Sequence, residues 1–324
     1  MNIKLSVIVP CYNVAQYLEG FLACLDKQWG EHDHYEVVFV NDGSTDSTPS
    51  LLAEYVAADT RHRVLINQAN QGVSGARNAG IKVARGEWIA FADPDDLLAD
   101  GAYALLMSKW LDGSIDMLSF KTVKVEENES LDLSQSLSGN VIWEGSTYMK
   151  SDFFLPNVWN CVYRKDMVEQ YKIRFRVETS FGEDSLFNAL LFSKGIRMKK
   201  VDSVIYYYVQ RSTSISHTDE DAKIRRSIEG LMFCIQEVNK FSGPQYSTAH
   251  WVQLFVLNIV SHLMRGSFSV REVRQIRDRL IAIGVFPLTS PWRTERLYFT
   301  ALAHPWLLPL VRTTVRVKHS LKKG

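Results

Sequence analysis

The sequence predicts an α/β protein with a mostly parallel central sheet, followed by a helical C-terminal region. In the first third of the chain, short apolar runs alternate with segments of helical periodicity, as in strand–helix–strand units. From about Ala222 onward the pattern changes to long helical segments. The 324 residues are 46% hydrophobic and 23% charged, which is typical of a globular protein. We therefore expect two parts, residues 1–220 and residues 221–324.

Four apolar runs have the length and the flanking turn residues of buried strands. They are Leu5–Val9, Glu36–Val40, Arg63–Asn67 and Ile89–Ala92. Between them, the spacing of apolar side chains predicts helices at Val14–Lys27, around Leu51–Tyr55 and at Val73–Ala84. We expect the first strand to stop at Pro10. The fourth should end by Pro94, which cannot donate a hydrogen bond to a sheet ladder.

A polar cluster follows each of these strands. The clusters are Pro10–Asn13, Asn41–Ser44, Asn70–Arg77 and Asp93–Asp96. Ligands of open α/β sheets bind at the carboxyl ends of the strands, so the four clusters predict one binding site.

This site lacks the usual phosphate-binding loops. Gly72, Gly75 and Gly80 do not have the Gly-x-Gly-x-x-Gly spacing, and no Gly-x-x-x-x-Gly-Lys-Ser/Thr sequence occurs. A dinucleotide dehydrogenase and a P-loop enzyme are therefore disfavoured. A nucleotide can instead be held by Tyr12 stacking on a base, by Asp42 accepting hydrogen bonds and by Arg77 approaching a phosphate.

Three carboxylates occur within four residues at Asp93, Asp95 and Asp96. Carboxylates this close repel one another, and burial raises their pKa values unless a cation neutralises them. Mg²⁺ or Mn²⁺ suits such oxygen ligands, particularly where it also holds substrate phosphates. The alternative is a solvated acidic turn with an aspartate as a helix N-cap.

Together these segments resemble glycosyltransferase family 2. The motifs are Val-Ile-Val-Pro-Cys-Tyr-Asn, Val-Asn-Asp-Gly-Ser-Thr-Asp-Ser-Thr, Asn-Gln-Gly-Val-Ser-Gly-Ala-Arg-Asn-Ala-Gly and Phe-Ala-Asp-Pro-Asp-Asp. The resemblance implies a GT-A fold, a nucleotide-sugar donor, expected to be UDP-linked, and inversion at the anomeric carbon. It makes Asp95 the metal ligand and places Asp93 near the ribose and the metal. Pro94 departs from the serine that is commoner in the family at that position.

The resemblance divides the first part into a nucleotide-sugar half, residues 1–120, and an acceptor half, residues 121–220. We expect the donor site to comprise Pro10, Tyr12, Asn13, Asp42, Gly43, Ser44, Asn70, Arg77, Asp93, Arg211 and Ser214. Arg211 and Ser214 lie in a segment resembling the family's loop over the bound donor, and a solvated basic turn is the alternative.

Glu183 and Asp184 precede an apolar helical segment. They match the family's acidic pair, whose aspartate is the catalytic base, and Glu183 would orient the acceptor. The alternative is an ordinary helix N-terminus, where acidic residues complement the helix dipole. Trp159 and Asn160 resemble the segment beside the acceptor pocket, although a core tryptophan is the alternative. His217 is a further acceptor-side candidate, although a single loop histidine is more often incidental.

The C-terminal region is basic. From Ser261 to the end there are 12 Lys and Arg against 3 Asp and Glu, a charge of +9, whereas the whole chain carries +1. Lys240–Arg265 is interrupted by polar residues, and Leu297–Val311 is too short to cross a bilayer comfortably. After Leu310, apolar and basic side chains recur on opposite faces at helical spacing, which favours an anionic membrane interface. Packing against the domain is the alternative.

The sequence thus predicts an inverting, metal-dependent glycosyltransferase that extends a surface glycan on a glycan or lipid-linked acceptor. Without a signal peptide pattern at Met1–Leu5, and with four cysteines that lack metal-ligand spacing, we expect a cytoplasmic protein, peripheral on the membrane's inner face. No nucleic-acid partner is expected. An inactive glycan- or nucleotide-sugar-binding relative is the first alternative. A sugar-1-phosphate nucleotidyltransferase is the second, although it would carry a Gly-rich loop after the first strand.

Overall fold

The computed structural model describes residues 3–29, 34–127, 129, 131–133, 139–146, 157–179, 181–211, 221–240, 249–286 and 299–307. Two compact units divide the chain. Unit 1 comprises residues 1–177 and 183–214, and unit 2 comprises residues 178–182 and 215–324. Each unit is described by itself.

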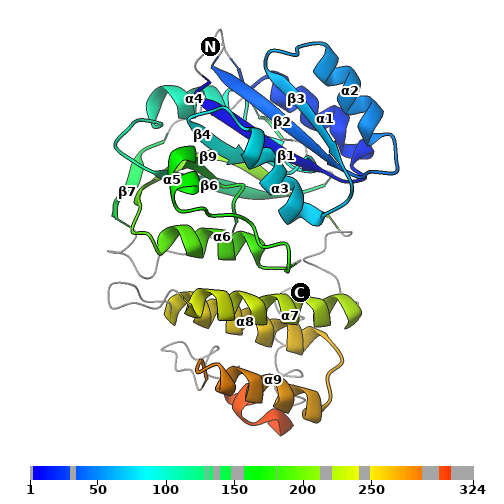
Figure 1. The fold of residues 1–324 in the computed structure, drawn as a ribbon, viewed down its shortest axis with the longest axis vertical. Coiled ribbons are helices and arrows are strands. Elements are labelled where there is room, and N and C mark those ends of the chain that lie inside the picture. Colours follow the sequence, from blue (N-terminus) through cyan, green and yellow to red (C-terminus); the bar gives the residue numbers. More distant parts are fainter. Residues whose placement is uncertain are drawn as a thin grey trace. The chain divides into compact units, whose positions relative to one another are not determined.

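Unit 1 is built on a nine-stranded sheet with the order β3-β2-β1-β4-β8-β6-β9-β5, in which β7 pairs with β9 (Figure 1). The strands are β1 (Leu5–Cys11), β2 (Tyr35–Asp42), β3 (Arg63–Gln68), β4 (Trp88–Phe91), β5 (Leu97–Leu98), β6 (Met117–Glu126), β7 (Val141–Ser146), β8 (Cys161–Arg164) and β9 (Arg197–Gln210). The first four are parallel to one another, whereas β8 is antiparallel to both of its neighbours. The predicted α/β class is therefore confirmed.

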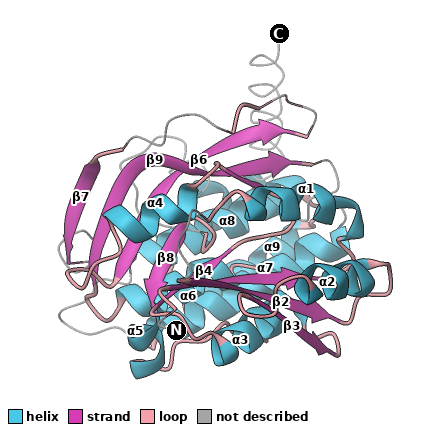
Figure 2. Cartoon of the chain, turned by 90° about the horizontal axis from the view of Figure 1, so that it is seen from above, coloured by secondary structure: helices cyan, strands magenta, loops and turns pink. Residues whose placement is uncertain are grey.

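Helices lie on both sides of the parallel strands (Figure 2). The helices of unit 1 are α1 (Ala15–Asp26), α2 (Thr48–Ala57), α3 (Gly72–Val83), α4 (Ala102–Lys109), α5 (Lys165–Gln170) and α6 (Glu183–Phe192). Successive strand side chains point to opposite faces, so Val7 and Val9 share a buried cluster with Leu18 of α1. Ile8 points the other way, toward α3, where a Cβ on Gly80 would lie 2.3 Å from it. Both faces are covered, which explains the nearly unbroken apolar run of β1.

One predicted boundary is wrong. The first strand does not stop at Pro10 but continues to Cys11, with Pro10 opposite Val40 of β2. The ladder between β1 and β4 already ends at Ile8 and Phe91. Pro10 therefore has a strand neighbour on one side only, and its missing N–H leaves no partner in β4 unsatisfied.

The described part of unit 2 is helical, as predicted for the C-terminal region. It contains α7 (Asp221–Asn239), α8 (Ala249–Arg265), α9 (Val270–Ala282) and the short 3₁₀ helix η3 (Pro305–Leu307), and α7 and α8 lie along each other (Figure 1). Ser269 caps α9 by accepting a hydrogen bond from the backbone N–H of Glu272, whose carboxylate accepts one in return from Ser269 N, 2.8 Å away. Among the described residues, no helix combines the length and the apolar character needed to cross a membrane.

Candidate active site

The loops after β1, β2 and β3 are joined by hydrogen bonds at one edge of the sheet. Asn13 N donates to Ser44 Oγ at 3.0 Å, and Thr45 N donates to Asn13 Oδ1 at 2.8 Å. Gly43 has a φ of +73°, and a Cβ there would lie 2.8 Å from Asn70 N. Only glycine allows this approach without strain. The structure therefore brings together the predicted donor residues of three separate loops.

Asp42 and Tyr12 have different surroundings at this edge. Asp42 is buried at the end of β2 and accepts hydrogen bonds from Gln68 Nε2 at 2.6 Å and from Gln71 N at 2.9 Å. The side chain of Tyr12 is 51% exposed. Asp42 is thus held in place as a hydrogen-bond acceptor, whereas the Tyr12 ring is open to a stacking partner.

Arg77 of α3 is buried and contacts three carboxylates. Its Nη1 lies 2.5 Å from Asp184 Oδ1 and 3.4 Å from Glu183 Oε1, and its Nη2 lies 3.2 Å from Asp93 Oδ1. Its guanidinium also lies over the Phe175 ring, 5.3 Å from the centroid. The predicted base pair and the predicted metal-side aspartate are therefore held by one arginine, whose nitrogens face carboxylates rather than open solvent.

The acidic turn after β4 is fixed by β9. Asp93 N donates to the Tyr206 hydroxyl at 3.0 Å, and Val209 N donates to Asp96 Oδ1 at 2.9 Å. Burial, with the negative charges of Asp93 and Asp95, raises the pKa of Asp96 to about 8. Asp96 thus resembles a structural carboxylic acid that is held by the backbone of β9.

Asp95 is more accessible than Asp96, with a side chain that is 44% exposed. Its Oδ2 lies 3.4 Å from Nη1 of Arg211, whose guanidinium stacks on the Tyr17 ring, 4.4 Å from the centroid. Burial and the charge of Asp93 raise the pKa of Asp95, and Arg211 opposes this shift. A cation beside Asp95 and Asp93 would relieve the same repulsion.

These two carboxylates suit a hard divalent ion. Within the described residues, no group of three or more His, Cys, Asp or Glu side chains forms a metal site by itself. Mg²⁺ is commonly held by one or two carboxylates together with substrate phosphates, so Asp93 and Asp95 fit an ion that arrives with a diphosphate.

Asp184 lies in the first turn of α6, with a side chain that is 16% exposed, beside the predicted acceptor segment. Val158 N lies 3.4 Å from Asp184 Oδ2. Burial raises the pKa of Asp184 to about 8, opposed by Arg77. A carboxylate whose pKa is raised in this way is suited to take up a proton near neutral pH.

Trp159 stacks on two tyrosines of β9. Its ring centroid lies 4.8 Å from that of Tyr206 and 5.6 Å from that of Tyr208. Asn160 Oδ1 accepts from Cys161 Sγ at 3.1 Å. Because the Tyr206 hydroxyl also contacts Asp93 N in the acidic turn, the side chain of Tyr206 connects Trp159 to that turn. Ser214 and His217 lie outside the described residues.

Three residues that hold the site in place were not predicted to be part of it. Gln68 and Gln71 fix Asp42, and Tyr206 fixes both Asp93 and Asp96. The run Tyr206-Tyr207-Tyr208 in a strand-like segment was the available signal, since a buried tyrosine hydroxyl needs a polar partner.

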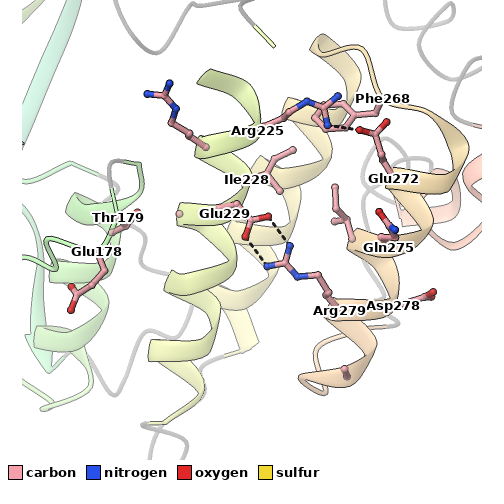
Figure 3. Close-up of a pocket in the computed structure, with 14 residues that line it drawn as sticks. Glu178, Thr179, Arg225, Ile228, Glu229, Phe268, Glu272, Gln275, Asp278 and Arg279 are labelled. Atoms are coloured by element: carbon pink, nitrogen blue, oxygen red, sulfur yellow. Dashed lines mark hydrogen bonds and ion pairs between the residues drawn. The ribbon is translucent and has the colours of Figure 1, made fainter. Parts of the chain in front are cut away.

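Unit 2 contains a groove of its own (Figure 3). It has a volume of about 1090 Å³ and is lined by residues of α7, α9 and the segment Glu178–Thr179. Two ion pairs join the helices: Arg279 contacts both oxygens of Glu229 at 2.6 and 2.8 Å, and Arg225 lies 2.5 Å from Glu272. The charged side chains that line the groove thus partly neutralise one another.

Comparisons with known proteins agree with the site's motifs. The family described as Glycosyl transferase family 2 matches residues 6–174. EpsJ of Bacillus subtilis, an uncharacterized glycosyltransferase, is 31% identical over 65% of this chain and 62% of its own length, so the match spans less than two thirds of that relative. YibD of Escherichia coli, also an uncharacterized glycosyltransferase, is 30% identical over 99% of this chain and 97% of its own length. A GalNAc(5)-diNAcBac-PP-undecaprenol beta-1,3-glucosyltransferase of Campylobacter jejuni is 29% identical over 65% of this chain and 67% of its length.

Solved structures share the fold. S. aureus TarS 1-349 in complex with UDP-GlcNAc has a TM-score of 0.59 and 22% identity, covering 99% of this chain and 92% of that one. The mannosyltransferase PcManGT from Pyrobaculum calidifontis, in complex with GDP-Man and Mn²⁺, has a TM-score of 0.59 and 18% identity, covering 94% of this chain and 86% of that one. The expected GT-A type of fold is thereby confirmed. With the match over residues 6–174 and the relative aligned along nearly its whole length, this chain belongs to glycosyl transferase family 2.

Proposed function

We propose that this protein is an inverting, metal-dependent glycosyltransferase that transfers a hexose or N-acetylhexosamine from a UDP-sugar to a hydroxyl of a glycan acceptor. The observation that carries the proposal is the bridge made by Arg77. It holds Asp93 of the acidic turn and Asp184 of α6 on one guanidinium, although they are 91 residues apart in the chain. A donor-side and an acceptor-side carboxylate are thereby fixed relative to each other, as a displacement reaction requires.

Asp184 acts as the general base. An acceptor hydroxyl is a weak nucleophile until a carboxylate removes its proton during attack. The raised pKa of Asp184 matches this task, and its contact with Val158 N places it beside the segment expected to meet the acceptor. Glu183, which shares Arg77 with Asp184, orients the acceptor. Attack from the face opposite the leaving diphosphate inverts the configuration without a covalent intermediate.

The donor occupies the edge where the loops after β1, β2 and β3 meet. Tyr12 stacks on the base and Asp42 accepts from base or ribose donors, while Pro10, Asn13, Gly43, Ser44 and Asn70 shape the loops around them. Asp93 and Asp95 hold a divalent ion, Mn²⁺ or Mg²⁺, which supplies positive charge to the departing diphosphate. Arg211, already paired with Asp95, is positioned to approach the same phosphates, and Ser214 follows it in the chain.

The acceptor is a glycan, carried on a lipid in the simplest case. The Campylobacter relative is named for an undecaprenol-linked substrate, and the TarS complex contains UDP-GlcNAc, which supports both the acceptor class and the UDP-sugar. Trp159, with its ring stacked on the β9 tyrosines, and Asn160 form the acceptor side together with His217. The basic residues after Leu308 hold the enzyme at the anionic inner surface of the cytoplasmic membrane.

The donor proposal is tested by thermal shift with a panel of nucleotide sugars, namely UDP-glucose, UDP-galactose, UDP-GlcNAc, UDP-GalNAc and GDP-mannose, with Mn²⁺ or with excess chelator. A donor at one hundred times its dissociation constant should stabilise the protein by about 2.7 kcal/mol. The stabilisation should require the ion and should be lost in Asp95→Ala. Equal stabilisation in excess chelator would contradict the metal assignment, and no response to any UDP-sugar would contradict the donor class.

The membrane proposal is tested by removing the residues from Leu308 onward. Each basic residue near an anionic surface contributes on the order of 1 kcal/mol, weakened by salt. The truncated protein should leave phosphatidylglycerol vesicles in a sedimentation assay but keep UDP release in solution. Equal sedimentation of the truncated and full-length proteins would contradict the proposal.

A further inference from the structure

The segment Glu178–Gly182 belongs to unit 2, although the residues on both sides of it in the chain belong to unit 1. Its last residue, Gly182, is joined by one peptide bond to Glu183 and precedes Asp184 by two positions. Contacts that hold the backbone of Gly182 in place therefore also restrain the first turn of α6. The segment contacts helices α7 and α8.

Thr179 organises the segment from within. Its side chain is buried, and its Oγ1 lies 2.6 Å from the carbonyl oxygen of Phe181, to which it donates, and 3.2 Å from Phe181 N, from which it accepts. Both polar groups of Phe181 are thus satisfied by one hydroxyl. Thr179 and Phe181 thus form a turn that is closed by side chain–backbone hydrogen bonds.

Helix α7 approaches this turn at Gly230. A Cβ on Gly230 would lie 2.5 Å from Thr179 Oγ1 and 2.9 Å from the carbonyl oxygen of Phe181, both closer than real Cβ atoms are found. Figure 3 shows Thr179 beside α7. Glycine inside a helix costs about 1 kcal/mol relative to alanine, so its presence here is explained by the close approach and not by helix propensity.

Two further contacts hold the end of the turn. Cys234, one helical turn after Gly230, has its Sγ 3.6 Å from the carbonyl oxygen of Gly182. Gly182 has a φ of +83°, and a Cβ there would lie 3.3 Å from that sulfur. The Phe181 ring packs edge-on against His262 of α8, with centroids 4.8 Å apart. Helices α7 and α8 together therefore fix the backbone immediately before the proposed base.

We infer that helix α7 positions the catalytic base, with Gly230 and Cys234 as positioning residues that act on Asp184 through Thr179, Phe181 and Gly182. The inference deepens the proposed function and rests on it. A misplacement of about 1 Å far from the chemistry can cost about a hundredfold in rate. Gly230 lies against Thr179 and Phe181, and Cys234 lies against Gly182, two residues before Asp184, so their effect is expected in turnover and not in donor affinity.

The test is Gly230→Ala, with Gly20→Ala in α1 as its control, because a Cβ on Gly20 meets nothing within 4 Å. UDP release is measured with Mn²⁺, the panel donors and a mixture of methyl glycosides as acceptors. Gly230→Ala should lower kcat about ten- to hundredfold. Its donor KM and its affinity for UDP should stay at the wild-type values. Gly20→Ala should keep wild-type kcat, and a wild-type kcat in folded Gly230→Ala would overturn the inference.

The double variant with Asp184→Asn separates positioning from general damage. If Gly230 acts through the base, Gly230→Ala should cause no further loss once Asp184 is asparagine. If the two substitutions instead lowered kcat independently, so that the factors multiplied in the double variant, the inference would be overturned. If Gly230→Ala does not fold, Cys234→Ala serves instead, with Cys24→Ala as the matched buried control. Cys234→Ala should lower kcat severalfold in the wild-type background only, and an unchanged kcat would contradict the inference. Absence of UDP release by the wild-type chain would instead overturn the proposed function.

Discussion

The charged groups of the two units are arranged in opposite ways. In unit 1 a buried arginine, Arg77, serves three carboxylates, and none of the three is more than 25% exposed. In unit 2, Arg279 and Glu229 form a pair whose side chains are 46% and 61% exposed. Buried ionic groups are costly to leave unpaired, whereas exposed pairs contribute little. The comparison predicts that breaking the buried network of unit 1 destabilises the protein strongly, whereas breaking an exposed pair of unit 2 changes its stability little.

The largest effect is expected at Asp184. Asp184→Asn keeps the size and most hydrogen bonding of the side chain but removes the proton acceptor. The rate should fall by roughly 10²–10⁴, the usual contribution of a general base, and the loss should appear in kcat and not in donor KM. Steady-state UDP release with the panel donors measures both constants. Near-wild-type turnover with a lowered melting temperature would mean that Asp184 serves only as a helix-terminal residue.

The pH profile sharpens this prediction. A base must be deprotonated to accept a proton, and burial raises the pKa of Asp184 to about 8. The wild-type kcat/KM should therefore rise with pH up to this region and then level off. Asp184→Asn should lose the rise. An unchanged profile in the variant would assign the titration to another group.

Arg77→Met should have the next largest effect, on stability. Methionine keeps the length of the side chain but leaves three carboxylates without their cation. Removing one partner of a buried ionic network destabilises a protein by about 3–5 kcal/mol. Urea unfolding at neutral pH measures the loss. It should shrink as the pH falls, because protonation of Asp184, whose pKa is raised to about 8, removes one of the negative charges that Arg77 neutralises. A loss below about 1 kcal/mol at neutral pH would contradict the buried network.

Arg279→Met is the matched change in unit 2. The same substitution there removes an exposed pair, so the free energy of unfolding should change by no more than about 1 kcal/mol. The same urea series measures it. A loss equal to that of Arg77→Met would break the comparison between the units.

The smallest effect is expected at Glu272, whose contribution to stability should depend on pH. Hydrogen bonds from Ser269, and then Arg225, lower the pKa of Glu272 from 4.5 to about 2. Because its folded pKa is lowered, the stabilisation is complete above the unfolded value and is lost as the pH falls through about 2. The melting temperatures of wild type and Glu272→Gln should therefore differ at pH 6 and converge as the pH falls toward 2. A difference that stays constant across this range would contradict the capping role of the carboxylate.

The fold class and the positions of most elements were predictable from the amino-acid sequence alone. Strand β1 and helix α1 follow from the periodicity of apolar side chains, which is a local property that a single sequence contains. The polar residues after each strand predicted the edge where the loops meet, because parallel strands place their carboxyl ends together. The roles given to individual residues, Asp184 and Asp95 above all, remain predictions.

Which of these residues share a partner is visible only in the folded chain. Asp184 lies 107 residues from Arg77, and no local pattern records that one guanidinium contacts it together with Asp93. The extension of β1 through Pro10 depends on where the ladder with β4 ends, which is likewise a property of the neighbouring strand. The contact of Gly230 with Thr179 is also non-local, since it joins a helix to a turn about fifty residues earlier. The periodicity of apolar side chains is a property of residues that are close together in the chain. Which buried charges pair, and which backbone segments pack closely, depends on how distant segments of the chain fold together.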